Sequence, residues 1–148
     1  MKTNYGDKKS KRAFLIQLFE KGFKVWDADI PENEYVFRPD IFAEKNGQQY
    51  AFELKARTCP STQYGDILIS EHKVHICDSH PELKYYLVFF YTDGVGYILD
   101  PSADHTVKWF NTPKTTHFGD HSYSKEPKAV YQTTVAQHFD FPTELIYN

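Results

Sequence analysis

The chain has 148 residues and a formal net charge of −3 at pH 7, with 41% hydrophobic and 17% aromatic residues. This composition excludes a disordered chain, and the length fits one domain with a sizeable core. The negative net charge excludes a protein that coats nucleic acid with its whole surface, so any polyanion must be met by a local basic patch.

The cysteine usage and the hydropathy pattern bear on the compartment. Cys59 and Cys77 lack the spacing of a zinc site and are too few for a disulfide framework. The sequence contains neither a signal peptide nor an apolar span of about 20 residues. We therefore expect a soluble, cytoplasmic protein in a reducing compartment, without membrane contact.

The first predicted element is an amphipathic helix from Lys8 to Lys21, with Asp7 or Ser10 as its N-cap and Gly22 as its stop. Its apolar stripe consists of Phe14, Leu15, Leu18 and Phe19. The first turn is basic, which is the unfavourable sign at the N-terminal end of a helix dipole. This basic cluster either grips nucleic-acid phosphates or is a solvated helix end; its members are Lys8, Lys9, Lys11 and Arg12.

A strand predicted from Phe23 to Ile30 leads into the central feature of the sequence, a β-hairpin. Two β-rich runs flank Asn46-Gly47, the dipeptide that best supports a two-residue type I′ turn. This turn sets the register of the two strands, and it predicts that Asp40 lies directly opposite Glu53.

The two faces of this hairpin differ in character. One face is expected to be apolar and to cover a core, whereas the other carries Arg38, Asp40, Glu53, Lys55 and Arg57. Pro39 cannot donate a ladder hydrogen bond, so a bend or bulge is expected beside Asp40. A bulge at this point would shift the predicted register.

The polar face has the composition of a metal site. Carboxylates directly opposite each other on adjacent strands have Cβ atoms about 5 Å apart and repel one another. A divalent metal between Asp40 and Glu53 would turn this repulsion into ligation, and Mg²⁺ favours carboxylates together with phosphate oxygens and water. The ammonium of Lys55, beside Glu53, is placed to hold or activate a water aimed at phosphorus. The alternative is a surface hairpin with an ordinary charged face.

Pro39-Asp40 and, twelve residues later, Glu53-Leu54-Lys55 resemble the signature of the PD-(D/E)XK phosphodiesterase superfamily. The resemblance implies a single α/β domain of restriction-endonuclease-like fold, with a central mixed β-sheet flanked by helices. The core would cover roughly residues 7–100, and residues 101–148 would be a C-terminal extension.

The resemblance also implies a division of roles at the site. Asp40, Glu53 and the Leu54 carbonyl would be metal ligands, Lys55 would stand beside the nucleophilic water, and Mg²⁺ or Mn²⁺ would be the cofactor. Many members of the superfamily place a further glutamate on the first helix, but here the early turns of that helix are basic. The third acidic ligand therefore stays unassigned; the alternatives are Asp7, Glu20 and Glu34.

After a loop at 58–65, a strand is expected from Asp66 to Ser70, and a helix from Ser70 to about Ser79. Lys73 is expected on the exposed side of that helix as a phosphate contact, and Arg57 is a further candidate contact to nucleic acid. The run from Lys84 to Thr92 predicts a strand buried on both faces.

Asp93-Gly94 then turns the chain into an edge strand, Val95 to Leu99. Beyond it, we expect a short strand at Val107–Phe110 and either strand or helix at Ala129–Phe139. Four aromatic residues here either stack on bases or, as we prefer, fill the core: Trp109, Phe110, Tyr123 and Tyr131.

Together these patterns predict a Mg²⁺-dependent endonuclease that hydrolyses phosphodiester bonds, with DNA preferred over RNA as the substrate. The alternative from another class is a catalytically silent module on the same fold that binds nucleic acid or protein. A homodimer is left open, because nothing in the sequence marks an interface.

Overall fold

The computed structural model of the chain describes residues 5–27, 39–115 and 121–147. Residues 28–30 of the predicted Phe23–Ile30 strand, together with Glu34 and Arg38, lie outside the described residues. The elements follow in the order α1 (Tyr5–Glu20), β1 (Lys24–Asp27), β2 (Ile41–Lys45), β3 (Gln48–Ala56), β4 (Asp66–Ser70), η1 (Glu71–His75), α2 (Ile76–Ser79), β5 (Leu83–Phe90), β6 (Val95–Leu99), β7 (Thr106–Thr115), β8 (His121–Gln132), η2 (Thr133–Val135), β9 (Gln137–Asp140) and η3 (Thr143–Leu145).

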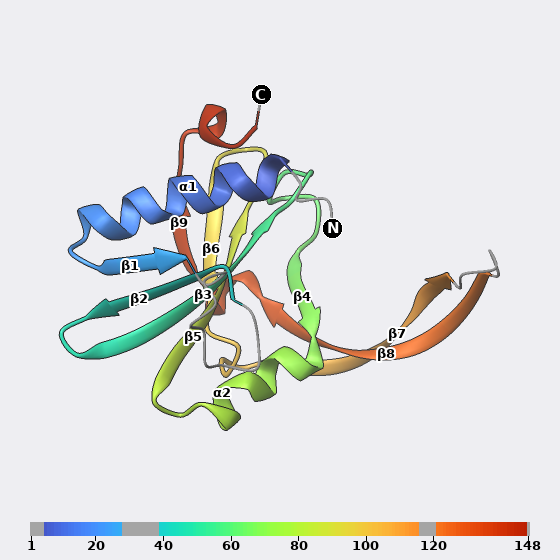
Figure 1. Ribbon diagram of the computed structural model, residues 1–148. Coiled ribbons are helices and arrows are strands. Elements are labelled where there is room, and N and C mark those ends of the chain that lie inside the picture. Colours follow the sequence, from blue (N-terminus) through green and yellow to red (C-terminus); the bar gives the residue numbers. More distant parts are fainter. Residues whose placement is uncertain (1–4, 28–38, 116–120, 148) are drawn as a thin grey trace.

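The strands form a central sheet in the order β1-β2-β3-β5-β6-β9 and a second sheet in the order β4-β8-β7. The β3–β5 pair is parallel, and the other neighbours in the central sheet are antiparallel, so this sheet is mixed. The helix α1 lies across one face of the central sheet, and the β7–β8 ribbon extends away from the body of the molecule (Figure 1).

Two apolar clusters hold these layers together. Phe14 and Leu18 of α1 pack with Ile41, Phe52 and Val88, which point to the helix side of the central sheet. On the opposite side, the central sheet packs against the second sheet through a cluster that includes Phe42, Leu87, Phe89, Ile67, Ile69 and Tyr131. Both faces of the central sheet are therefore covered, as expected for the strand β5, whose residues 87–90 are all buried.

The predicted hairpin turn is confirmed. Asn46 and Gly47 both have positive φ angles, 54° and 79°, which is the backbone that a type I′ turn requires. The register runs from Lys45↔Gln48 to Ile41↔Phe52, as the turn predicts. Ile41 and Phe52 consequently share the apolar face, and Glu53 and Lys55 are directed to the other one.

Several expectations for α1 were wrong. The helix begins at Tyr5, so Ser10 is an interior residue that is fully buried, and it is not an N-cap. Phe19 does not belong to the buried stripe, because its side chain is 73% exposed. Gly22 ends the helix as predicted, with a φ angle of 87° that only glycine adopts readily.

The second half of the chain also differs from its prediction. The Ser70–Ser79 helix is divided into η1 and α2. The strand β6 is an interior strand, since β9 pairs with its outer side. The two strands of the ribbon, β7 and β8, are longer than expected and pair from Thr106↔Val130 to Thr115↔His121. Among the described residues, none of the helices combines the length and the apolar character needed to cross a membrane.

Candidate active site

Asp40 reaches the site from the bend that precedes β2. Its N–H donates to the Phe52 carbonyl at 2.9 Å, although Phe52 is already the register partner of Ile41. Two residues of one strand therefore face one residue of the other, as in a β-bulge. The prediction that Asp40 lies directly opposite Glu53 was wrong for this reason, and the bulge lies beside Pro39, where a bend or bulge was expected.

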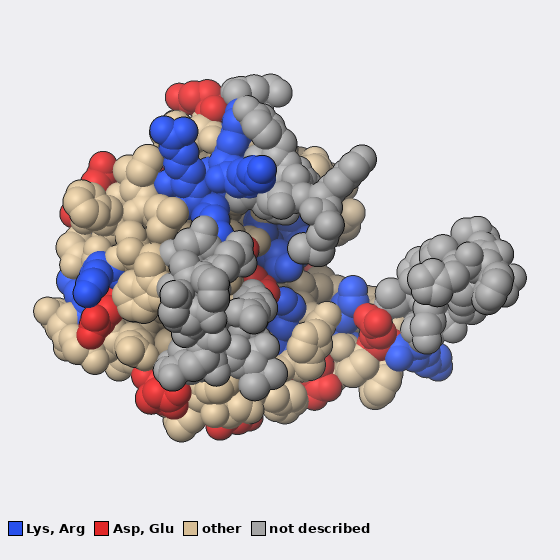
Figure 2. All heavy atoms as spheres, viewed as in Figure 1, with Lys and Arg blue, Asp and Glu red and all other residues tan. Residues whose placement is uncertain are grey.

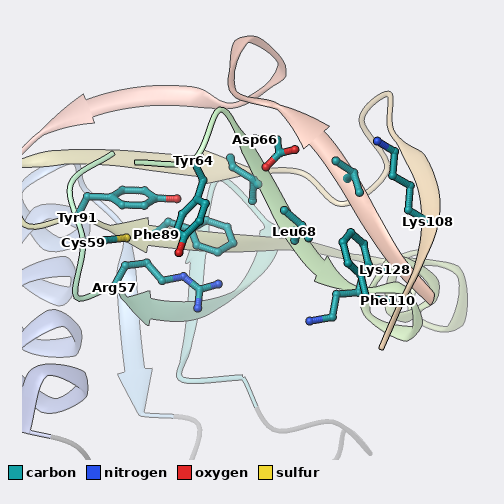
Figure 3. Close-up of a pocket in the computed structure, with 12 residues that line it drawn as sticks. Arg57, Cys59, Tyr64, Asp66, Leu68, Phe89, Tyr91, Lys108, Phe110 and Lys128 are labelled. Atoms are coloured by element: carbon teal, nitrogen blue, oxygen red, sulfur yellow. The ribbon is translucent and has the colours of Figure 1, made fainter. Parts of the chain in front are cut away.

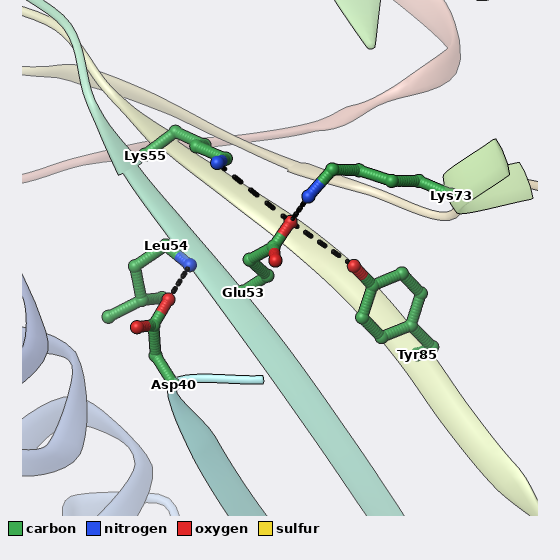
Figure 4. A network of polar contacts seen from close by, with 6 residues as sticks. All are labelled: Asp40, Glu53, Leu54, Lys55, Lys73 and Tyr85. Carbon is green, nitrogen blue, oxygen red and sulfur yellow. Dashed lines mark hydrogen bonds and ion pairs between the residues drawn. The ribbon is translucent and has the colours of Figure 1, made fainter. Parts of the chain in front are cut away.

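The bulge gives the Asp40 carboxylate a backbone partner. Its Oδ2 accepts a hydrogen bond of 2.7 Å from the Leu54 N–H (Figure 4). The carboxylate thus replaces the backbone carbonyl that would accept this hydrogen bond in a regular β-ladder. This hydrogen bond fixes Asp40 beside the strand that carries Glu53 and Lys55. The site is thus formed by the first residue before β2 and by the second half of β3.

Glu53, the residue before Leu54, is the centre of a polar network formed with Lys73, Tyr85 and Lys55. Its Oε2 forms an ion pair with Lys73 Nζ, accepts a hydrogen bond of 3.2 Å from the Tyr85 hydroxyl and lies 4.0 Å from Lys55 Nζ (Figure 4). The Glu53 and Lys73 side chains are only 18% and 17% exposed, whereas Lys55 is 38% exposed. Lys55 is therefore the cation of this network that water and substrate can reach most easily.

The position of Lys73 corrects the prediction for it. We expected this residue on the exposed side of a regular helix, but η1 directs its ammonium inward to Glu53. Tyr85 was not predicted as part of the site. It arrives there because the parallel pairing of β3 and β5 places it opposite Ala51, and no local sequence signal indicates that contact.

The electrostatics of Asp40 are unfavourable to its charge. Burial raises the pKa of the Asp40 carboxyl above its ordinary value of 3.8, and the nearby charge of Glu53 raises it further. The hydrogen bond from Leu54 and the charges of Lys11 and Lys55 act in the opposite direction without cancelling the rise. In the protein alone, the positive charges near the half-buried Asp40 carboxylate are therefore too weak to offset its burial and the charge of Glu53.

These residues fit a hard divalent cation in part. Asp40 Oδ1 and Glu53 Oε1 have no hydrogen bond to any residue that the structure describes, and the Leu54 carbonyl belongs to the residue that directly follows Glu53. Oxygen donors of this kind are those that Mg²⁺ prefers. Within the described ranges, no group of three His, Cys, Asp or Glu side chains could hold a metal, so the third acidic ligand is not found there.

None of the three alternatives can be assigned as the third acidic ligand. Glu20 is exposed at the C-terminal end of α1, opposite to the end that carries the basic cluster. Glu34 and the side chain of Asp7 lie outside the described residues.

The basic cluster of α1 spans its early turns. Lys8 and Arg12 are exposed, and Lys9 and Lys11 are half-buried. Lys11 is near enough to Asp40 for its charge to lower the pKa of that carboxyl. Figure 2 shows basic side chains gathered where α1 begins and continuing toward the hollow between the two sheets, where acidic atoms are also visible. The cluster therefore borders the candidate site.

Arg57 lies two residues beyond Lys55 and contributes to a pocket of about 620 Å³ between the two sheets (Figure 3). Of the aromatic residues for which base stacking was considered, Phe110 lines this pocket, Trp109 is 65% exposed and Tyr131 is fully buried. The core interpretation is thus correct for Tyr131 and wrong for Trp109, and the side chain of Tyr123 lies outside the described residues.

No protein-family model and no curated protein matches this chain. Among solved structures, the chain is similar to Hjc, a Holliday junction resolvase from the archaeal hyperthermophile Archaeoglobus fulgidus. The two are 14% identical with a TM-score of 0.51, and the match covers 84% of this chain and 87% of the resolvase. At this identity the likeness shows the fold alone. It confirms the predicted α/β, restriction-endonuclease-like fold with a central mixed sheet.

Proposed function

We propose that this protein is a Mg²⁺-dependent endonuclease that hydrolyses phosphodiester bonds in DNA. The observation that carries the proposal is the convergence of Asp40, Glu53 and Lys55 at one end of the β2–β3 hairpin. The same fold in a Holliday junction resolvase is consistent with such an activity. We assign the chain to the PD-(D/E)XK superfamily as part of this proposal.

The acidic residues have a ligand role in this proposal. Asp40, Glu53 and the Leu54 carbonyl would hold Mg²⁺, with Mn²⁺ as an alternative. When bound, the metal supplies positive charge next to the scissile phosphate. Tyr85 and Lys73 hold the Glu53 carboxylate in place through Oε2, which leaves Oε1 for a ligand.

Lys55 has a separate role in the chemistry. Its ammonium is the most exposed cation of the network and lies 4.0 Å from Glu53 Oε2. It can therefore donate a hydrogen bond to a water molecule and hold it in line with phosphorus. Such orientation of the nucleophile, together with fixed positive charge around the phosphate, lowers the barrier to hydrolysis.

The basic cluster and Arg57 would supply contacts to the phosphate backbone. Lys8 and Arg12 are exposed on α1, and Lys11 lies close to Asp40. These charges allow a protein of net charge −3 to bind a polyanion on one face. Phosphate contacts of this kind fix orientation and carry no sequence preference of their own.

The proposal is tested by incubating the protein with plasmid, linear duplex, single-stranded and four-way-junction DNA, in Mg²⁺, Mn²⁺ or EDTA. We expect internal cleavage of at least one DNA in the presence of metal and none in EDTA. A matched RNA panel measures the preference for DNA. Absence of cleavage in every metal, with a folded protein, would contradict the proposal.

One observation favours a second candidate, a catalytically silent module that binds nucleic acid. The ammonium of Lys73 already neutralises Glu53, and the described residues provide only two acidic ligands. Such a module would bind the same DNA panel with equal affinity in EDTA and in Mg²⁺, and it would cleave none of its members.

A further inference from the structure

A pocket of about 620 Å³ lies between the end of β3 and the second sheet. This volume is within the range of sites that hold small organic ligands. Its lining has an apolar part made of buried side chains and a polar rim, and consists of Arg57, Cys59, Tyr64, Asp66, Ile67, Leu68, Phe89, Tyr91, Lys108, Phe110, Lys128 and Val130. None of these residues belongs to the carboxylate pair or to its network.

The pocket carries an excess of positive charge. Three lining side chains are cationic, Arg57, Lys108 and Lys128, and a single one, Asp66, is acidic. Within the described part of the chain, none of the three cations forms an ion pair. The pocket is therefore suited to an anion, and a neutral apolar ligand would leave these charges without a partner.

Aromatic rings position two of these cations. The Arg57 guanidinium lies 5.3 Å from the centre of the Phe89 ring, and Lys128 Nζ lies 6.0 Å from the centre of the Phe110 ring. In Figure 3, the ends of Arg57 and Lys128 enter the pocket from opposite walls. Cation–π contacts of this kind hold the head groups without neutralising their charge.

The pocket also offers aromatic surface to a flat ligand. Tyr64 lines the pocket from the loop before β4 with 62% of its surface exposed, and the half-buried Phe110 lines it from β7. Aromatic faces of this kind stack on nucleobases, whichever base is present. A base needs an open face for this contact, and a base stacked inside a duplex has none.

The pocket lies beside the candidate active site, because Arg57 follows Lys55 at the end of β3. Lys55 and Arg57 are two residues apart and on the same side of the chain, about 7 Å from each other along an extended backbone. The register of β3 with β5 places Lys55 opposite Phe89, which lies in the pocket floor beneath Arg57. A DNA strand whose phosphate lies at Asp40 and Glu53 would thus have its next nucleotide at this pocket.

We propose that the pocket binds one unpaired nucleotide of the DNA substrate next to the cleaved bond. The base stacks against Tyr64 and Phe110, and Arg57 and Lys128 hold its phosphate. This inference rests on the proposed nuclease function, and it deepens that function by naming the substrate class: DNA with an unpaired nucleotide at a branch, bulge or flap. Continuous duplex DNA cannot fill the pocket without unstacking a base.

The test uses duplex DNA with a single unpaired 2-aminopurine, whose fluorescence falls when it stacks, and a matched duplex in which the same base is paired. Titrations are made in EDTA, so that no cleavage is needed. We expect the protein to quench the unpaired probe and to bind the bulged duplex more tightly. Tyr64→Ala should abolish most of the quenching and weaken binding of the bulged DNA by roughly tenfold, the size of one lost stacking contact.

Matched variants separate the pocket from general effects. Phe19→Ala removes a similarly exposed aromatic side chain from α1, which contributes no residue to the pocket lining, and should leave quenching unchanged. Lys128→Gln should weaken binding of the bulged DNA and leave the paired duplex unaffected. Unchanged quenching in Tyr64→Ala, or equal affinity of wild type for the two duplexes, would overturn the inference.

The outcomes for the two proposals are distinguishable. Quenching of the unpaired probe without cleavage in any metal supports the pocket and contradicts the nuclease activity. Metal-dependent cleavage without quenching supports the nuclease activity and overturns the pocket assignment.

Discussion

Replacing Asp40 by Asn should stabilise the protein in the absence of metal. Burial and the neighbouring Glu53 raise the pKa of the Asp40 carboxyl, so folding penalises its charged form. Asn imitates that neutral form and keeps an oxygen to accept the 2.7 Å hydrogen bond from the Leu54 N–H. Burial and the nearby Glu53 charge both act against the carboxylate, and from the general size of side-chain interactions between neighbouring strands we expect a gain of about 0.5–1 kcal/mol.

Asp40→Ala is the matched control for the hydrogen bond. It removes the same charge, but it leaves the Leu54 N–H without its acceptor, which costs about 1–3 kcal/mol in a buried setting. The order of stability in EDTA should therefore be Asn above both wild type and Ala. Excess Mg²⁺ should reverse the order of Asn and wild type, because a ligand at 100 times its Kd adds about 2.7 kcal/mol to the protein that binds it.

The pH dependence of this difference follows from linkage. A carboxyl whose pKa is raised by folding binds protons more tightly in the native state, so the contribution of Asp40 to the stability of wild type falls as the pH rises from 3.8 through the folded pKa. The gain in unfolding free energy of Asp40→Asn over wild type should accordingly be absent below pH 3.8 and present at pH 7. The assay is urea unfolding of the three proteins in EDTA at both pH values. An Asn variant that is less stable than wild type at pH 7 would refute the account that the Asp40 carboxylate lacks compensating positive charge in the apo protein.

Three further outcomes are expected. Replacing Lys8, Lys9 and Arg12 by Gln should weaken DNA binding and flatten its dependence on salt, since fewer counterions are released; an unchanged slope would identify a solvated helix end. Lys73→Gln should lower the unfolding free energy of the apo protein by about 1–2 kcal/mol, because Glu53 loses a charged partner. Mg²⁺ should stabilise this variant more than wild type, and unfolding in EDTA and in Mg²⁺ measures both effects. Gly96→Ala should destabilise the protein by about 1–3 kcal/mol, because the new Cβ would overlap with the Phe139 ring. In the control Gly65→Ala the new Cβ meets no atom within 4 Å, so this variant should be neutral in the same unfolding assay.

Local chemistry made the hairpin predictable. Asn46-Gly47 admits few turn types, and the turn sets which side chains share a face, so the apolar side of β2 and β3 and the neighbouring positions of Glu53 and Lys55 follow from the sequence. The position of Asp40 depends on a bulge beside Pro39. The missing N–H of proline indicates that the ladder is disturbed there, but it does not specify the hydrogen bond to Leu54.

Long-range pairing accounts for what the sequence did not reveal. The strand β4 pairs with β8 in a register that joins Asp66 to Gln132, and no local pattern marks two such distant runs as partners. The pocket depends on this pairing, because its walls come from both sheets. Lys73 was misplaced since a regular helix directs side chains differently from the short η1 segment that the chain adopts.

The central claim is that Glu53 and Lys55 take part in metal-dependent cleavage. The most direct measurement compares DNA cleavage in Mg²⁺ by wild type, Glu53→Gln and Lys55→Ala, with the fold of each verified by circular dichroism. The account predicts that both variants stay folded and lose cleavage by about 100-fold or more, as expected when a ligand or a group that orients the nucleophile is removed. Full metal-dependent cleavage in both folded variants would contradict it and would exclude these two residues from the mechanism.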